Sequence, residues 1–221
     1  MHSVINKKFY QKMRSNFFSM KKEYKATGSA LSAFLIWSLK GSAKNLISLL
    51  WYHIHSRYKR SEINVKTIEF ICNGNICRSV FAEKYAAELL EKKRYSIKST
   101  SSGLWAKEGS CSPAEAIRAA SMFNVDLSDH FSKRTDVQHL LNADLIFCMH
   151  INQYRRLCKM FPACKEKTFL LKAYTKPICF DINVEDPYGK SIQQFFRCFE
   201  EISSSIKMVV RKIERGKLLA K

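Results

Sequence analysis

The sequence predicts an α/β fold of three layers, in which helices cover both faces of a central four-stranded parallel sheet. Two observations predict it. From residue 63 onward, short apolar runs rich in β-branched residues alternate with longer segments whose apolar residues recur at helical spacing. Strands separated by helices are joined by right-handed crossovers, which make the strands parallel and put helices on both faces. A chain of 221 residues, 46% of them hydrophobic, is long enough for one such domain and an extension.

The elements follow one another along the chain. Strands are expected at Val65–Ile71, Tyr95–Ser101, Leu145–Met149 and Thr168–Leu171. Helices are expected at Ser79–Lys93, Pro113–Phe123, Asp136–Leu141, Ile151–Met160 and Ser191–Lys212. Parallel sheets of this kind bind ligands beyond the carboxyl ends of their strands, so we expect a site where the first strand ends.

The run from Phe70 to Ser79, FICNGNICRS, lies where the first strand gives way to the first helix. A loop that closes in this way points successive N–H groups inward, and the helix start adds positive potential. The concavity therefore suits an oxyanion, with Cys72 at its floor and the Arg78 guanidinium across two anion oxygens. The same surroundings favour the thiolate of Cys72, which predicts a nucleophile for phosphoryl transfer to sulfur.

Other loop positions support this interpretation. Gly74 permits a positive φ, and Asn75 tolerates a left-handed conformation, as a tight cradle requires. Ser79 can cap the helix and can also donate a hydrogen bond to the Cys72 sulfur. A bare Cys-x5-Arg spacing is common by chance, and the alternative is a buried cysteine beside an ordinary turn. The strand before the loop and the helix after it make the signal specific.

Together with segments 81–83, 100–103, 142–149 and 186–188, the loop resembles the low-molecular-weight protein tyrosine phosphatases, whose loop has the form Cys-x-Gly-Asn-x-Cys-Arg-Ser. The resemblance covers roughly Ile63 to Lys221. It implies an enzyme that hydrolyses phosphotyrosine through a cysteinyl-phosphate intermediate, without a cofactor. Cys72 would be the nucleophile, Arg78 the phosphate clamp and Asp186 the general acid.

Asp186 also suits this role on chemical grounds. A phenolate leaving group needs a proton that a carboxylic acid can supply, and the resulting carboxylate can activate the hydrolytic water. Pro187 stiffens the loop, and Tyr188 offers an aromatic wall for a phenyl ring. Asp-Pro alone is a common turn, but its position before the last helix favours the functional interpretation. Asp181 and Glu185 are rival acids that we interpret as solvated loop charges.

The resemblance assigns two flanking residues. Trp105 matches a segment that lines the mouth of the site, and His130 matches a histidine that hydrogen-bonds the loop asparagine. A packing tryptophan and a surface histidine are the plainer interpretations. The chain departs from the family at Val80, where proline is usual, and at His150, where aspartate is common, so an acidic cap is lost. The residues expected to contact phosphate or substrate are Asn73, Gly74, Asn75, Ile76, Cys77, Ser79, Trp105 and Tyr188.

The eight cysteines are scattered over a mid-sized α/β pattern, which does not indicate a disulfide framework. A thiolate nucleophile needs reducing conditions, so we expect a cytoplasmic protein. Cys72 and Cys77 lie close enough to pair under oxidation, which the resemblance implies as a protective state; alternatively, Cys77 is a small loop residue. A metal site is not expected, because no Cys-x2-Cys pair occurs and one residue separates His53 from His55.

Residues 1–62 form a basic extension ahead of the phosphatase-like part, residues 63–221. Up to residue 60 there are twelve Lys or Arg residues and one acidic residue. Two apolar stretches, Ala30–Leu39 and Leu46–Ile54, are each shorter than the roughly 20 residues of a membrane span, and lysines separate them. A helical hairpin at an anionic membrane surface and helices packed on the domain or on a protein partner are equal alternatives. A signal peptide and nucleic-acid binding are disfavoured.

Three functions compete. The leading one is a protein tyrosine phosphatase acting on a phosphotyrosyl protein, for example a tyrosine kinase at a membrane. A thiol-coupled arsenate reductase shares the Cys-x5-Arg loop, but Cys148 and Cys158 do not reproduce the spacing of its resolving cysteines. A non-catalytic phosphotyrosine-binding module would not need nucleophile, clamp and acid together. Protein-arginine phosphatases of this fold tend to carry threonine at the position of Ile76, which favours tyrosine over arginine; a small phosphomonoester is a further candidate.

Overall fold

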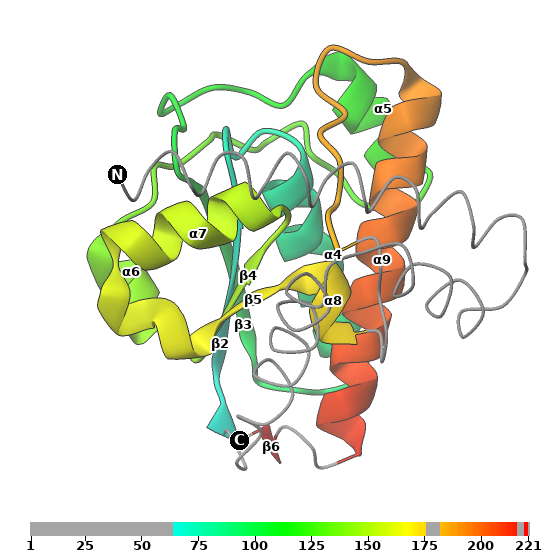
Figure 1. Ribbon diagram of the computed structural model, residues 1–221. Coiled ribbons are helices and arrows are strands. Elements are labelled where there is room, and N and C mark those ends of the chain that lie inside the picture. Colours follow the sequence, from blue (N-terminus) through cyan, green and yellow to red (C-terminus); the bar gives the residue numbers. More distant parts are fainter. Residues whose placement is uncertain (1–63, 176–181, 216–218, 221) are drawn as a thin grey trace, which may run out of the picture. The chain divides into compact units, whose positions relative to one another are not determined.

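A computed structural model describes residues 64–175, 182–215 and 219–220 (Figure 1). The expectations for residues 1–62 and for Asp181 lie outside these residues. Within the described ranges, none of the helices combines the length and the apolar character that crossing a membrane requires.

The central sheet has four parallel strands in the order β3-β2-β4-β5, as predicted. The strands are β2 (Thr67–Cys72), β3 (Lys98–Gly103), β4 (Leu145–Cys148) and β5 (Thr168–Leu170). Cys72 pairs with Gly103, so the last residues of β2 and β3 lie side by side at the carboxyl edge of the sheet. A separate two-stranded parallel sheet joins β1 (Asn64–Val65) to β6 (Leu219–Ala220).

Helices cover both faces of the sheet, which confirms the three layers (Figure 1). One face carries α4 (Arg78–Lys92), α5 (Ala114–Ser121), α8 (Leu171–Thr175) and α9 (Ile192–Glu214). The other carries α6 (Val137–Asn142), α7 (Ile151–Met160) and the 3-10 helix η1 (Pro162–Lys167). The two layers hold the segments that meet at the carboxyl edge of the sheet.

Aromatic packing fixes α4 against α9. The fully buried Phe81 ring stacks on Phe199 with 4.0 Å between ring centroids, and the edge of Phe123 meets it at 5.4 Å. Burial of each such side chain contributes about 1.5–3 kcal/mol to the free energy of unfolding. Since Arg78 begins the same helix, this packing gives its guanidinium a rigid base.

Some predicted boundaries are wrong for local reasons. Strand β3 begins at Lys98 rather than Tyr95, because Arg94 adopts a φ of 59° and the Tyr95 N–H still bonds to the end of α4. Helix α4 begins at Arg78, and no side chain caps it, so Ser79 is not its cap. Helix α8 was missed because it follows β5 within one continuous buried run, in which periodicity cannot separate strand from helix.

Helix α7 begins and ends where the sequence predicts. His150 caps it, because its Nδ1 accepts the N–H of Asn152 at 3.1 Å while its own N–H donates to Gln153 Oε1. An uncharged imidazole nitrogen thus does the work of the acidic cap that the sequence lacks.

Candidate active site

The sulfur of Cys72 lies at the floor of the loop between β2 and α4 and is buried. Its Sγ accepts the N–H of Asn75 at 3.2 Å and lies 3.0 Å from Ser79 Oγ. Ser79 Oγ already accepts a hydrogen bond from Asn75 Nδ2 at 2.9 Å, so its own proton is left to donate. The sulfur is nearer to that hydroxyl than the alternative acceptor, the Ser102 carbonyl at 3.4 Å. Both are hydrogen bonds that a sulfur nucleophile can accept.

Asn75 holds the loop in shape from inside the protein. It is fully buried and adopts a left-handed φ of 53°, as predicted. Its Nδ2 also donates to Ser101 Oγ at 2.8 Å, and its Oδ1 accepts the Lys133 N–H at 2.8 Å. The His130 ring contacts Asn75 as expected, with Nε2 2.7 Å from the main-chain oxygen. Burial lowers the pKa of His130, against the opposing effect of this hydrogen bond.

The glycine that the loop depends on is Gly103, not Gly74. Gly74 does not have the positive φ that we expected, because Asn75 makes the turn. A Cβ on Gly103 would lie 2.6 Å from the Asn73 carbonyl oxygen and 2.9 Å from the Asn75 nitrogen. The loop therefore rests directly on the backbone of β3, and this requirement is invisible in the sequence of the loop.

Replacement of Gly103 by alanine is expected to displace the loop between β2 and α4 from the backbone of β3. We expect kcat/KM for an aryl phosphate to fall on the order of 100-fold, because small displacements of reacting groups are that costly. Steady-state assay beside Gly109→Ala tests this, because Gly109, unlike Gly103, has a positive φ of 73° that strains an alanine, but no atom lies within 4 Å of its added Cβ. Equal activity in the two variants would contradict the close contact.

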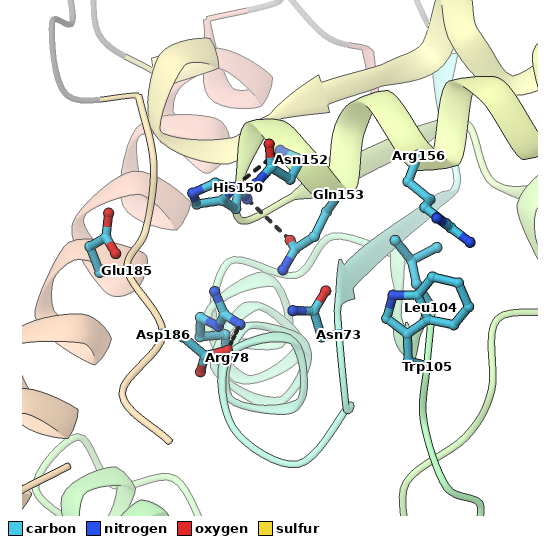
Figure 2. Close-up of a pocket in the computed structure, with 10 residues that line it drawn as sticks. All are labelled: Asn73, Arg78, Leu104, Trp105, His150, Asn152, Gln153, Arg156, Glu185 and Asp186. Atoms are coloured by element: carbon cyan, nitrogen blue, oxygen red, sulfur yellow. Dashed lines mark hydrogen bonds and ion pairs between the residues drawn. The ribbon is translucent and has the colours of Figure 1, made fainter. Parts of the chain in front are cut away.

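Arg78 reaches back from the first turn of α4 and is buried. Its Nη1 donates to the Val184 carbonyl at 3.1 Å, and its Nη2 forms an ion pair with the Asp186 carboxylate (Figure 2). Its Nε is buried without a hydrogen-bond partner among the described residues. A buried N–H of this kind needs an acceptor, and an oxygen of a bound anion would supply one.

The segment that carries Asp186 is fastened by hydrogen bonds to the main chain of residues 149 and 151. The Val184 N–H donates to the Met149 carbonyl at 2.7 Å, and Asn183 Oδ1 accepts the Ile151 N–H at 2.9 Å. The sequence interpretation missed Lys172, which is buried and donates to the Asn183 carbonyl at 3.3 Å. A lysine inside the apolar run of residues 170–174 was the available signal for it.

Lys172 also donates to Glu201 Oε2 on α9 at 2.8 Å. The buried ammonium is therefore compensated by a carboxylate, as its burial requires. The ion pair links α8 and α9 to the segment preceding the acid, and so helps to set where Asp186 lies.

A cavity of about 390 Å³ opens above the loop (Figure 2). Arg78 and Asp186 lie at one end, and Trp105, 49% exposed, lies at the other. Tyr188 is 63% exposed and does not line it. The lining residues are Asn73, Arg78, Leu104, Trp105, His150, Asn152, Gln153, Arg156, Glu185 and Asp186. Glu185, which we interpreted as a solvated charge, is exposed and also belongs to this rim.

Of the loop residues expected to contact phosphate or substrate, only Asn73 lines the cavity. Ile76 is half-buried and packs against the core, and Gly74 is also half-buried. Cys77 is buried, and burial together with the neighbouring Cys72 raises the pKa of its thiol. Both cysteines are free thiols, so their pairing under oxidation stays a prediction.

Comparison with known proteins gives one consistent result. The sequence model of a family described as low molecular weight phosphotyrosine protein phosphatase matches residues 67–218. The low molecular weight protein-tyrosine-phosphatase Wzb of Escherichia coli K12 is 32% identical over 125 residues, 57% of this chain and 80% of that protein. A protein-arginine-phosphatase of Geobacillus stearothermophilus is 28% identical over 148 residues, 66% of this chain and 95% of that protein. The solved structure of the low molecular weight protein tyrosine phosphatase of T. tengcongensis, 29% identical, superposes with a TM-score of 0.63 and covers 66% of this chain and 99% of that one.

Proposed function

The chain belongs to the low molecular weight phosphotyrosine protein phosphatase family, and we propose on that basis that it hydrolyses phosphotyrosine in proteins through an intermediate on Cys72. One observation carries the assignment of roles. A buried sulfur that receives hydrogen bonds lies in a loop whose arginine has an unpartnered N–H and an adjacent carboxylate. The proposed clamp and the proposed acid thus meet from segments more than 100 residues apart in the sequence.

Binding would begin at Arg78. A phosphate dianion offers more acceptors than the Asp186 carboxylate, so it can take the guanidinium edge, including the unpartnered Nε. Loop N–H groups hold its other oxygens. Release from Arg78 frees the Asp186 carboxylate, which takes up a proton from water and then lies next to the ester oxygen of the leaving group as a carboxylic acid.

Two displacements complete the reaction. The Cys72 sulfur forms a bond to phosphorus while the bond from phosphorus to the tyrosine oxygen breaks, and Asp186 gives its proton to that oxygen. Asp186 then takes a proton from water, whose oxygen attacks phosphorus as the bond to sulfur breaks. The departing thiolate returns to its hydrogen bonds with Ser79 and the Asn75 N–H.

Protein-arginine phosphatase is the second candidate, favoured by the relative from Geobacillus stearothermophilus. Ile76 favours phosphotyrosine over phosphoarginine as the substrate, because its apolar side chain packs against the core and has no hydroxyl to orient a guanidinium or water. Arsenate reduction is disfavoured, because Cys148 is fully buried in β4 and burial raises the pKa of its thiol. A resolving cysteine needs access and thiolate character.

A substrate panel tests the proposal. Purified full-length chain is assayed with a phosphotyrosyl peptide, a phosphoarginyl peptide of the same length, and arsenate with thioredoxin as reductant. We expect turnover of phosphotyrosine that vanadate inhibits, and kcat/KM at least tenfold higher than for phosphoarginine. A preference for phosphoarginine, or arsenate reduction, would replace the proposal with the corresponding alternative.

We further propose that residues 1–62 form a separate segment that brings the enzyme to an anionic membrane surface, where a tyrosine kinase would be a natural substrate. Its support is the excess of twelve basic residues over one acidic residue before residue 61. At low salt, the full chain is expected to float with phosphatidylserine-containing liposomes but not with neutral ones. If the chain floated with neither kind of liposome, membrane association through residues 1–62 would be contradicted.

A further inference from the structure

The wall of the cavity contributed by α7 carries no carboxylate. His150, Asn152, Gln153 and Arg156 line it, and the carboxylates of Glu185 and Asp186 lie toward the other end (Figure 2). Arg156 is exposed and shares its end of the cavity with Trp105. The phosphate clamp Arg78 lies at the opposite end, so two guanidinium groups face one cavity from different places.

Arg156 is held in place without using up its hydrogen-bond donors. Its guanidinium carbon lies 4.1 Å from the centroid of the Trp105 ring. A cation–π contact of this kind leaves N–H groups of the guanidinium available to an acceptor. Among the described residues Arg156 forms no ion pair with an acidic side chain. A positioned guanidinium with free donors at a cavity rim is suited to a carboxylate or a phosphate.

We propose that Arg156 and Trp105 form an anion subsite that binds an acidic group adjacent to the phosphotyrosine of the substrate. The anion is either the carboxylate of a neighbouring aspartate or glutamate or the phosphate of a second phosphotyrosine. This inference rests on the proposed function, because the substrate phosphate must occupy the Arg78 end for the acidic neighbour to reach the other end.

The subsite would act mainly on specificity, by raising kcat/KM for phosphotyrosyl segments with an acidic neighbour above that for segments with an uncharged one. Stacking on Trp105 fixes Arg156 before the substrate arrives, so little side-chain entropy is lost when an anion binds. An uncharged neighbour would leave the guanidinium solvated and gain nothing. The interaction is between exposed charges, so an effect of about fivefold is expected, and added salt should weaken it.

Three phosphotyrosyl peptides of equal length test the subsite on the full chain. The first has aspartate on both sides of the phosphotyrosine, the second has asparagine there, and the third has a second phosphotyrosine. The quantity compared is the ratio of kcat/KM for each acidic peptide to that for the asparagine peptide. The variants are Arg156→Gln and Lys159→Gln, which remove the same charge from the same helix, although Lys159 does not line the cavity.

Wild type and Lys159→Gln are expected to prefer the acidic peptides about fivefold, and Arg156→Gln is expected to bring the ratio close to one. Loss of preference for only the aspartate peptide or only the doubly phosphorylated peptide identifies which anion the subsite takes. An unchanged ratio in Arg156→Gln, or an equal loss in Lys159→Gln, would overturn the subsite while leaving the phosphatase intact. Absence of turnover of all three peptides by wild type would instead overturn the proposed function, and the subsite with it.

Discussion

Replacement of Cys72 by serine is expected to abolish turnover of phosphotyrosyl peptides, with kcat falling on the order of 10⁴-fold or more. A serine hydroxyl is far less acidic than a thiol and is a poor leaving group from phosphorus, so both displacements fail. The loop itself should persist, because the Asn75 N–H and Ser79 Oγ can hydrogen-bond an oxygen as they do the sulfur. Steady-state assay measures the loss, and titration with inorganic phosphate checks that the cradle still binds its anion.

Cys111→Ser is the matched control for this change. Cys111 is exposed and outside the loop, so its replacement should leave kcat unchanged. Retained activity in Cys72→Ser, or comparable losses in the two variants, would mean that the sulfur at the floor of the loop is not the nucleophile.

Replacement of Asp186 by asparagine is expected to slow phosphotyrosine hydrolysis by about 10²–10⁴-fold. Asparagine keeps the size of the side chain but cannot give a proton to the leaving oxygen. The loss should therefore depend on the leaving group. It should be largest for phenyl phosphate and much smaller for para-nitrophenyl phosphate, whose stable phenolate departs without a proton.

Glu185→Gln makes the same chemical change at the neighbouring residue. Glu185 lines the cavity, but it does not contact Arg78, whereas Asp186 does. We expect kcat to change little in this variant for either leaving group. A larger loss of kcat in Glu185→Gln than in Asp186→Asn would transfer the role of acid to Glu185. If Asp186→Asn lost the same factor of activity with phenyl phosphate and with para-nitrophenyl phosphate, Asp186 would not be the donor of a proton to the leaving group.

The local sequence predicted the part of the site that lies in one continuous segment, the loop between β2 and α4. The spacing of Cys72 and Arg78 is set by the strand and helix that flank them, so the loop could be recognised from its context. The left-handed conformation of Asn75 follows from its residue type. Gly74 was misjudged because only one residue in the loop needs a positive φ, and the sequence offers two that tolerate it.

The missed residues depend on neighbours that are distant in sequence. Gly103 must be a glycine because another segment lies against its backbone. Lys172 acquires its role from a carbonyl eleven residues away and a carboxylate on α9. In the sequence, Arg156 is an ordinary exposed arginine of a helix, and only the fold shows its contact with the Trp105 ring. Such contacts arise from strand order and helix packing, which periodicity and spacing do not specify.

The most direct test of the mechanism is to locate the phosphoryl group during turnover. Full-length enzyme is mixed with excess phosphotyrosyl peptide, quenched in acid within one catalytic cycle, digested and examined by mass spectrometry. The mechanism predicts one phosphoryl group on the Cys72 sulfur, lost when vanadate is present before mixing. Rapid turnover with Cys72 unmodified, or with phosphate on another residue, would contradict it.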